Sequence, residues 1–157
     1  MVHVLILSPP SSIMRVFYGI DLAVGGRGAN RRDDVMLVQF FLKSVSRTTD
    51  SVTKESYLPP GQAPLQVDGL YGPRTAAYFR HFAGVLSRAS QGTAMQLWQD
   101  AVIDAKPPGI NVGPIHGRVY AIIRLNTSYA DNFGIDRHSA IDKDPDFPRE
   151  LRPKLFV

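Results

Sequence analysis

Side chains able to bind sugars, carboxylates or phosphates gather between residues 67 and 82 of this chain. A tyrosine ring can stack on the face of a sugar or a peptide, and an arginine can form paired hydrogen bonds with a carboxylate. A glycine-containing loop supplies the tyrosine ring and the arginine. The segment after it adds a second phenol and an imidazole at helical spacing. The candidate ligand-binding residues are Asp68, Tyr71, Arg74, Thr75, Tyr78 and His81.

The same residues also have a purely structural interpretation, which the sequence leaves open. Gly69 and Gly72 suit backbone conformations with positive φ, Asp68 suits an Asx-turn, and Pro73 suits the first turn of a helix. The polar residues that follow also fit a solvated helix face. A rigid loop beside a helix N-terminus still makes a usable edge for a binding groove.

Residues suited to catalysis or metal binding are sparse. The chain has no cysteine, four widely spaced histidines, and only Glu55 and Glu150 as glutamates, which gives little support to thiol or paired-carboxylate chemistry. The run 142–146 begins like a calcium loop, but Phe147 and Pro153 occupy the positions that need glycine and glutamate. His138 has aspartates nearby without a metal-ligand spacing. We therefore expect no enzyme activity, no metal and no cofactor.

Length and composition favour one globular domain. The chain has 157 residues and 44% hydrophobic residues, which is too many for a disordered chain, and no apolar run approaches a membrane span. Its net charge of +4 suits an anionic partner, such as a wall polymer, and equally an ordinary protein surface. The first residues lack the basic region and cleavage site of a signal peptide, so we expect cytoplasmic synthesis and a non-Sec route to any wall or periplasmic target.

Hydrophobic periodicity predicts a mainly α architecture. Four helices are expected: 30–46 with Asn30 as N-cap, 73 to the break at Gly92, 93–105 with Trp98 in the core, and 115–126. Extended segments are predicted over 2–7 and 14–20, an exposed loop over 47–64, and an extended tail over the last thirty residues. The predicted organisation is a single domain with an N-terminal arm (1–29), a core (30–90) and a C-terminal helical extension with its tail (91–157).

Two segments of this core match a known pattern. They are Asp34-Val-Met-Leu-Val-Gln-Phe-Phe-Leu42 and Val67-Asp-Gly-Leu-Tyr-Gly-Pro-Arg-Thr75, followed by the helix aromatic Phe82. Together they resemble the peptidoglycan-binding-like domain of bacterial and phage cell-wall proteins. The resemblance implies a three-helix module over about residues 30–90, with a groove edged by the loop and the helix after it. Two features depart from the family: the connection 43–64 is longer, and Ala83 stands where the family has glutamine.

These observations favour a non-catalytic module that engages peptidoglycan, as part of a phage or of a secretion or injection system. In that interpretation Tyr71 stacks on a sugar or peptide face and Arg74 meets peptide carboxylates. The alternative is a structural or adaptor protein that keeps the fold and binds another protein, which suits the long 43–64 connection and the proline-containing tail. A catalytic function carried by 93–157 is a third and weaker hypothesis. Neither nucleic-acid binding nor membrane insertion is expected.

Overall fold

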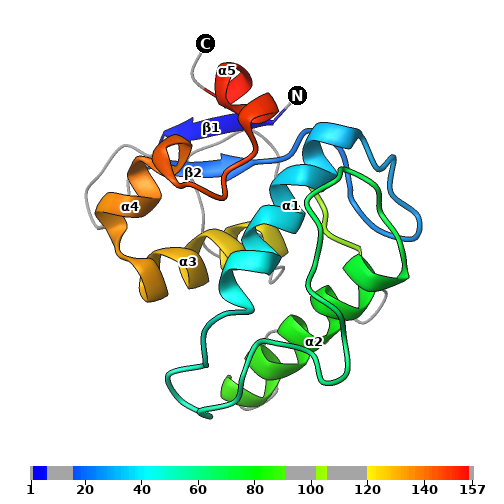
Figure 1. The fold of residues 1–157 in the computed structure, drawn as a ribbon, viewed down its shortest axis with the longest axis vertical. Coiled ribbons are helices and arrows are strands. Elements are labelled where there is room, and N and C mark those ends of the chain that lie inside the picture. The colour runs from blue at the N-terminus through cyan, green and yellow to red at the C-terminus, as the bar shows by residue number, and fades with distance from the viewer. Residues whose placement is uncertain (1, 7–15, 91–101, 106–119, 156–157) are drawn as a thin grey trace.

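The computed structural model describes residues 2–6, 16–90, 102–105 and 120–155, and this described part is mainly α-helical (Figure 1). Its helices are α1 (Arg32–Val45), α2 (Pro73–Ala89), α3 (Ala121–Phe133), α4 (Ile135–Ser139) and α5 (Arg152–Leu155). Two 3-10 turns, η2 (Ile141–Lys143) and η3 (Arg149–Leu151), and two short strands, β1 (His3–Ile6) and β2 (Val16–Gly19), complete it. The mainly α prediction is confirmed, as are the first two predicted helices. No helix in the described part is long and apolar enough to cross a membrane.

Helix α1 runs through the middle of the molecule and contacts both α2 and α3 (Figure 1). Phe40 and Phe41 are fully buried, and the Phe40 ring meets Phe147 edge to face with centroids 5.0 Å apart. It also contacts Tyr129 from α3 at 5.7 Å. Such rings bury large areas and dominate core energetics. A helix that carries apolar residues on all sides must be covered on all sides, which is why α1 occupies the centre.

The start of α1 differs from the prediction that Asn30 is its N-cap. The capping position is Arg31, whose side chain makes no capping bond. Asn30 itself has a φ of 51°. Its side chain accepts from the Gly25 N–H and donates to the Gly25 carbonyl, both at 2.8 Å. Asparagine tolerates the left-handed region and bonds readily to nearby backbone, so here it closes the glycine loop instead of capping the helix.

The extended segments predicted over 2–7 and 14–20 contain the two strands β1 and β2, which pack on the core. Strands β1 and β2 pair antiparallel, with Val4 opposite Tyr18. Phe17, Tyr18 and Ile20 are buried. The Tyr18 N–H and carbonyl both bond the side chain of Asn126 on α3, at 2.8 and 2.9 Å. The buried side-chain amide of Asn126 therefore joins strand β2 to the helical core.

Residues 102–105 are extended, so the end of the helix predicted over 93–105 is wrong. Ile103 exchanges two backbone hydrogen bonds with Val24, at 2.7 and 2.9 Å, and is fully buried. A β-branched side chain packs well in this extended geometry. The remainder of that predicted helix, including Trp98, lies outside the described residues.

Residues 128–155 of the predicted tail form short helices and turns that pack on the core, so the prediction of an extended tail is wrong for this described part. Helix α3 continues past its predicted end at residue 126 as far as Phe133, before Gly134 with a φ of 94°; its predicted start at 115 lies outside the described residues. Buried apolar residues then recur after α3, namely Ile141 in η2, Phe147 between η2 and η3, Leu151 in η3 and Leu155 in α5. The elements η2, η3 and α5 each bury a single apolar residue, so their sequences show no helical period.

The predicted exposed loop 47–64 folds back onto the helices. Thr49 and Ser56 form an antiparallel bridge, and the Asp50 carboxylate accepts hydrogen bonds from Thr53 and from the Tyr57 hydroxyl. The buried Tyr57 ring packs on Phe82 of α2 with centroids 5.5 Å apart. We call residues 48–57 the hairpin; in Figure 1 α3 lies between it and the two strands.

Candidate functional site

The predicted binding loop is held to α1 by the side chain of Gln39, which is 1% exposed. Its Nε2 donates to Asp68 Oδ1 at 3.0 Å, and to the Leu70 carbonyl and the Thr75 hydroxyl at 3.1 Å. Its Oε1 accepts from the backbone N–H groups of Asp68 at 3.1 Å and Gly69 at 2.9 Å. One amide thus ties α1, the loop and the first turn of α2 together. A buried polar network whose members are satisfied fixes a single arrangement.

Gly69 allows this loop to approach α1 closely. Its φ is 76°, and an added Cβ would lie 2.5 Å from Arg32 Cγ and 2.9 Å from Met36 Cγ. We expect Gly69→Ala to lower the free energy of unfolding by about 2 kcal/mol, through left-handed strain and crowding. Gly72→Ala, whose Cβ would meet nothing within 4 Å, should change it by less than about 1 kcal/mol. Urea unfolding followed by circular dichroism measures both, and equal stabilities would contradict the close approach.

A hollow of about 560 Å³ opens where the loop meets the start of α2. We call it the loop hollow. The predicted residues that line it are Asp68, Tyr71, Arg74 and Thr75, and the others include Gln39, Gln62, Leu65 and Gln66. Its size falls within the range of small-molecule sites, and its walls combine an apolar floor with amide, hydroxyl and charged groups. This hollow is consistent with the prediction that the loop forms one edge of a groove.

The polar and charged groups of the loop hollow differ in the ion pairs and hydrogen bonds that they already form with described residues. Arg74 is exposed, and none of the described residues forms an ion pair with it. The Leu70 N–H first, and then the Gln39 amide, lower the pKa of Asp68, so its carboxylate is ionised at neutral pH. Thr75 is buried and already bonded to Gln39, which makes it a support for the loop. Arg74 is therefore the strongest candidate for a direct ionic contact with a ligand.

Tyr71 stands between the loop hollow and a neighbouring one of about 430 Å³. The neighbouring hollow is also lined by Gly26, Ala76 and Arg80, and the two share Tyr71, Gly72 and Pro73. The Tyr71 ring is half-buried and packs partly against the core. A ring held on one side and open to two hollows is positioned to stack on a ligand with little loss of side-chain freedom.

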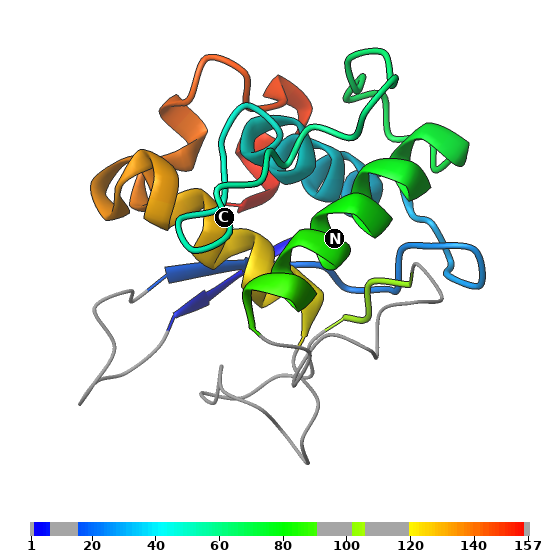
Figure 2. The ribbon, with the colours of Figure 1, turned by 90° about the horizontal axis from the view of Figure 1, so that it is seen from below.

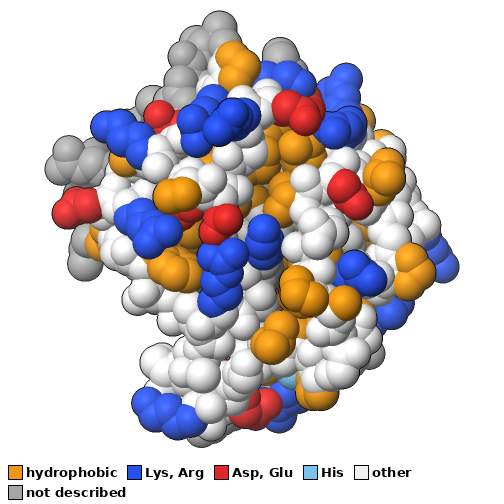
Figure 3. All heavy atoms as spheres, in the orientation of Figure 1, with side chains coloured by type: hydrophobic (Ala, Val, Ile, Leu, Met, Phe, Trp, Pro, Cys, Tyr) orange, Lys and Arg blue, Asp and Glu red, His pale blue; other side chains and the backbone are white. Residues whose placement is uncertain are grey.

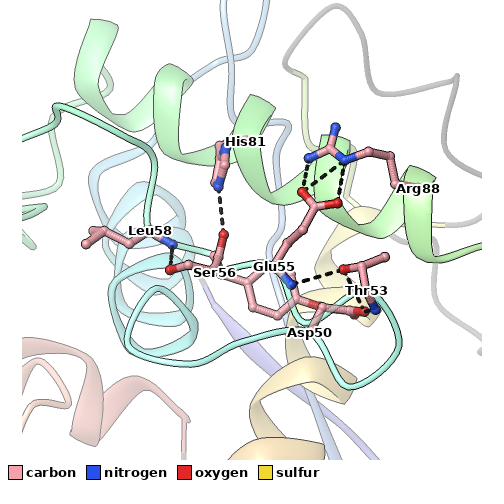
Figure 4. Close-up of polar contacts among 8 residues, drawn as sticks. Asp50, Thr53, Glu55, Ser56, Leu58, His81 and Arg88 are labelled. Carbon is pink, nitrogen blue, oxygen red and sulfur yellow. Dashed lines mark hydrogen bonds and ion pairs between the residues drawn. The ribbon is translucent and has the colours of Figure 1, made fainter.

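Tyr78 and His81 do not line the loop hollow, because the 48–64 segment covers them. Tyr78 is buried and donates from its hydroxyl to the Ala63 carbonyl at 3.0 Å. The His81 Nε2 lies 2.8 Å from the Ser56 carbonyl, and Arg88 forms a bidentate pair with Glu55 beside it (Figure 4). The long connection therefore occupies this face of α2 and leaves the start of α2 open. Of the six candidates, the structure brings four together and separates these two.

Sequence reasoning missed the role of Gln39 although it quoted the segment that contains it. The available signal was a glutamine in the middle of an apolar helix, since a buried amide requires hydrogen-bond partners from another segment. Gln62 and Gln66 were also missed, and nothing in their spacing distinguishes them from ordinary exposed loop residues.

The surface charge does not form a single block on the face seen in Figure 3, where basic and acidic side chains alternate. Exposed ion pairs such as Arg32–Glu150 and Arg47–Asp146, both at 2.6 Å, contribute to this mixture. Within the described part of the chain, no three histidine, aspartate or glutamate side chains are grouped so as to hold a metal ion. Recognition at the loop hollow must rest on its own few groups.

Comparisons of the chain with protein-family models, with curated proteins and with solved structures find no match.

Proposed function

We propose that this protein is a non-catalytic module that binds bacterial peptidoglycan through the loop hollow. The observation that carries the proposal is the joint presence of Tyr71 and Arg74 at a hollow built on the Gln39 network. In this proposal the half-buried Tyr71 ring stacks on a sugar or peptide face, and the exposed Arg74 guanidinium meets a carboxylate of the wall peptide. The similarity of residues 34–42 and 67–75 to the peptidoglycan-binding-like pattern supports the same function.

Co-sedimentation with purified sacculi tests the proposal. We expect salt-tolerant pelleting of the wild-type protein, and an apparent affinity at least about tenfold weaker for Arg74→Ala, because a hydrogen bond to a charged group is lost. Tyr71→Ala should lose binding as well. Arg149→Ala is the matched control, since Arg149 is exposed, lies outside the hollow and has the same charge.

Three outcomes would decide against it. Pelleting that disappears with moderate salt in every variant reduces the effect to net charge. Equal loss in Arg149→Ala removes the loop hollow from the explanation. No pelleting at all would end the wall-binding proposal. It would favour the adaptor function, for which the 69% exposed Leu70 at the rim of the same hollow offers an apolar contact for a protein partner.

A further inference from the structure

A second hollow, of about 230 Å³, lies at the other end of α2. Its walls come from the hairpin, from the last turn of α2 and from one face of α3 (Figure 2 shows these elements). We call it the α3 hollow. It shares no lining residue with the loop hollow, so a ligand bound here is independent of the proposed wall-binding function.

The half-buried Arg124 guanidinium has one unsatisfied donor in the wall of the α3 hollow. Its Nε is buried and has no hydrogen-bond partner, and none of the described residues forms an ion pair with its guanidinium. A buried charged donor without an acceptor is costly, so this position favours a bound anionic oxygen.

Asp50, which also lines the hollow, does not supply that oxygen. Its Oδ1 accepts from the Val52 N–H at 2.9 Å and from the Thr53 N–H at 2.7 Å and hydroxyl at 3.1 Å. Its Oδ2 accepts from the Tyr57 hydroxyl at 2.8 Å. Since a carboxylate has about four acceptor sites, the hairpin itself uses those of Asp50.

The carboxylate of Asp131 lies on the same face of α3, two turns after Arg124. Arg124, Ser128 and Asp131 follow at intervals of four and three residues, which aligns them along one side of the helix, and all three line the hollow. Arg124 and Asp131 are about 10 Å apart along the helix axis, from the rise per residue, and form no ion pair with each other. The carboxyl end of α2, at Leu86 and Ala89, also borders the hollow and adds partial negative charge.

Opposite charges that face one hollow without pairing match a ligand that carries both charges. We propose that the α3 hollow binds a short peptide with free termini, whose carboxylate pairs with Arg124 and whose ammonium group pairs with Asp131. An extended residue spans roughly 3.3–3.6 Å and a hydrogen bond adds about 2.9 Å at each end, so two or three residues bridge the separation. The volume equals that of about eight water molecules, which suits small side chains against Val52 and Leu86. A simple anion would meet the carboxylates of Asp50 and Asp131, and a simple cation would meet Arg124.

Titration of the full-length protein with alanyl-alanine, followed by amide chemical shifts and calorimetry, tests the proposal. We expect saturable shifts in the hairpin and in α3 for the free dipeptide. Blocking either terminus, by N-acetylation or by C-terminal amidation, should weaken binding at least about tenfold, because each blocked form leaves one charge-assisted contact unmade.

Variants separate the two contacts. Arg124→Met keeps the length of the side chain and should abolish the preference for a free carboxylate, whereas Asp131→Asn should abolish the preference for a free ammonium group. Asp131 is exposed, so its variant folds even if Arg124→Met does not. Arg149→Ala is the control, because Arg149 is exposed and lines neither hollow, and this variant should bind the dipeptide as the wild type does. Equal affinity for free and blocked peptides, unchanged affinity in Asp131→Asn, or no saturable shift at millimolar dipeptide would each overturn the proposal.

Discussion

We expect the Gln39→Leu variant to unfold with a free energy about 4 kcal/mol below that of the wild type and to lose binding at the loop hollow. Leucine has a similar volume but cannot bond, so the buried Gly69 N–H loses its acceptor and the buried Thr75 hydroxyl loses its donor. Each buried polar group left unpaired costs about 1–3 kcal/mol. Because the amide joins three segments, the loop is expected to separate from α1 as a unit.

Urea unfolding and sacculus pelleting of the same preparation measure both parts of this expectation. Gln62→Leu is the matched control, because it makes the same substitution at an exposed position of the hollow rim. The control should keep its stability. A Gln39→Leu protein as stable as Gln62→Leu would show that the amide does not hold the loop.

Helices α1 and α2 were predictable because their apolar residues recur at helical spacing over several turns. In α2, Pro73 marks the start, and Phe79, Phe82 and Leu86 are buried as the period requires. Four members of the candidate site were also predictable, since they are neighbours in sequence around one tight loop. Helical periodicity and loop motifs predict these features because both depend on residues that are close together in the sequence.

The other features depend on contacts between residues far apart in sequence. Tyr78 and His81 have the side-chain types of a ligand site, but the hairpin and its continuation, some fifteen to twenty-five residues upstream, cover them. Likewise Tyr18 pairs with Asn126 across a separation of 108 residues, and no periodicity reports such a pairing. The tail was mispredicted for the same reason, since it packs on segments much earlier in the chain: α5 contacts β1, and Phe147 meets Phe40 of α1.

His138 should make the stability of the protein fall as the pH is lowered from 6.5 to about 4. The ring is fully buried beside Tyr18, Phe41 and Tyr129, and burial lowers its pKa to about 4. Its Nε2 donates to Asn126 Oδ1 at 2.9 Å, because the Asn126 amide nitrogen already donates to two carbonyls. The ring Nδ1 is therefore unprotonated, and it is buried with no hydrogen-bond partner. A second proton would place an unpaired charge in the aromatic core.

The sign of the effect follows from proton uptake by the two states. Between pH 6.5 and 4 the unfolded chain binds a proton at His138 that the folded chain refuses, so acidification favours unfolding by about 3 kcal/mol over this window. Asp34 acts in the opposite direction: burial raises the pKa of its carboxyl, against the lowering effect of the Asp21 and Leu22 N–H groups, so acidification favours its folded form. The contribution of His138 must therefore be isolated by subtraction.

His138→Gln removes the titrating ring and keeps an amide that can donate to Asn126. Urea unfolding of the variant and the wild type, at constant ionic strength across pH 6.5 to 4, should give a flatter pH dependence for the variant, with the two curves converging as the pH falls. Parallel curves for His138→Gln and the wild type would mean that the His138 pKa is the same in the folded and unfolded chains, and the acid sensitivity would then belong to the carboxylates.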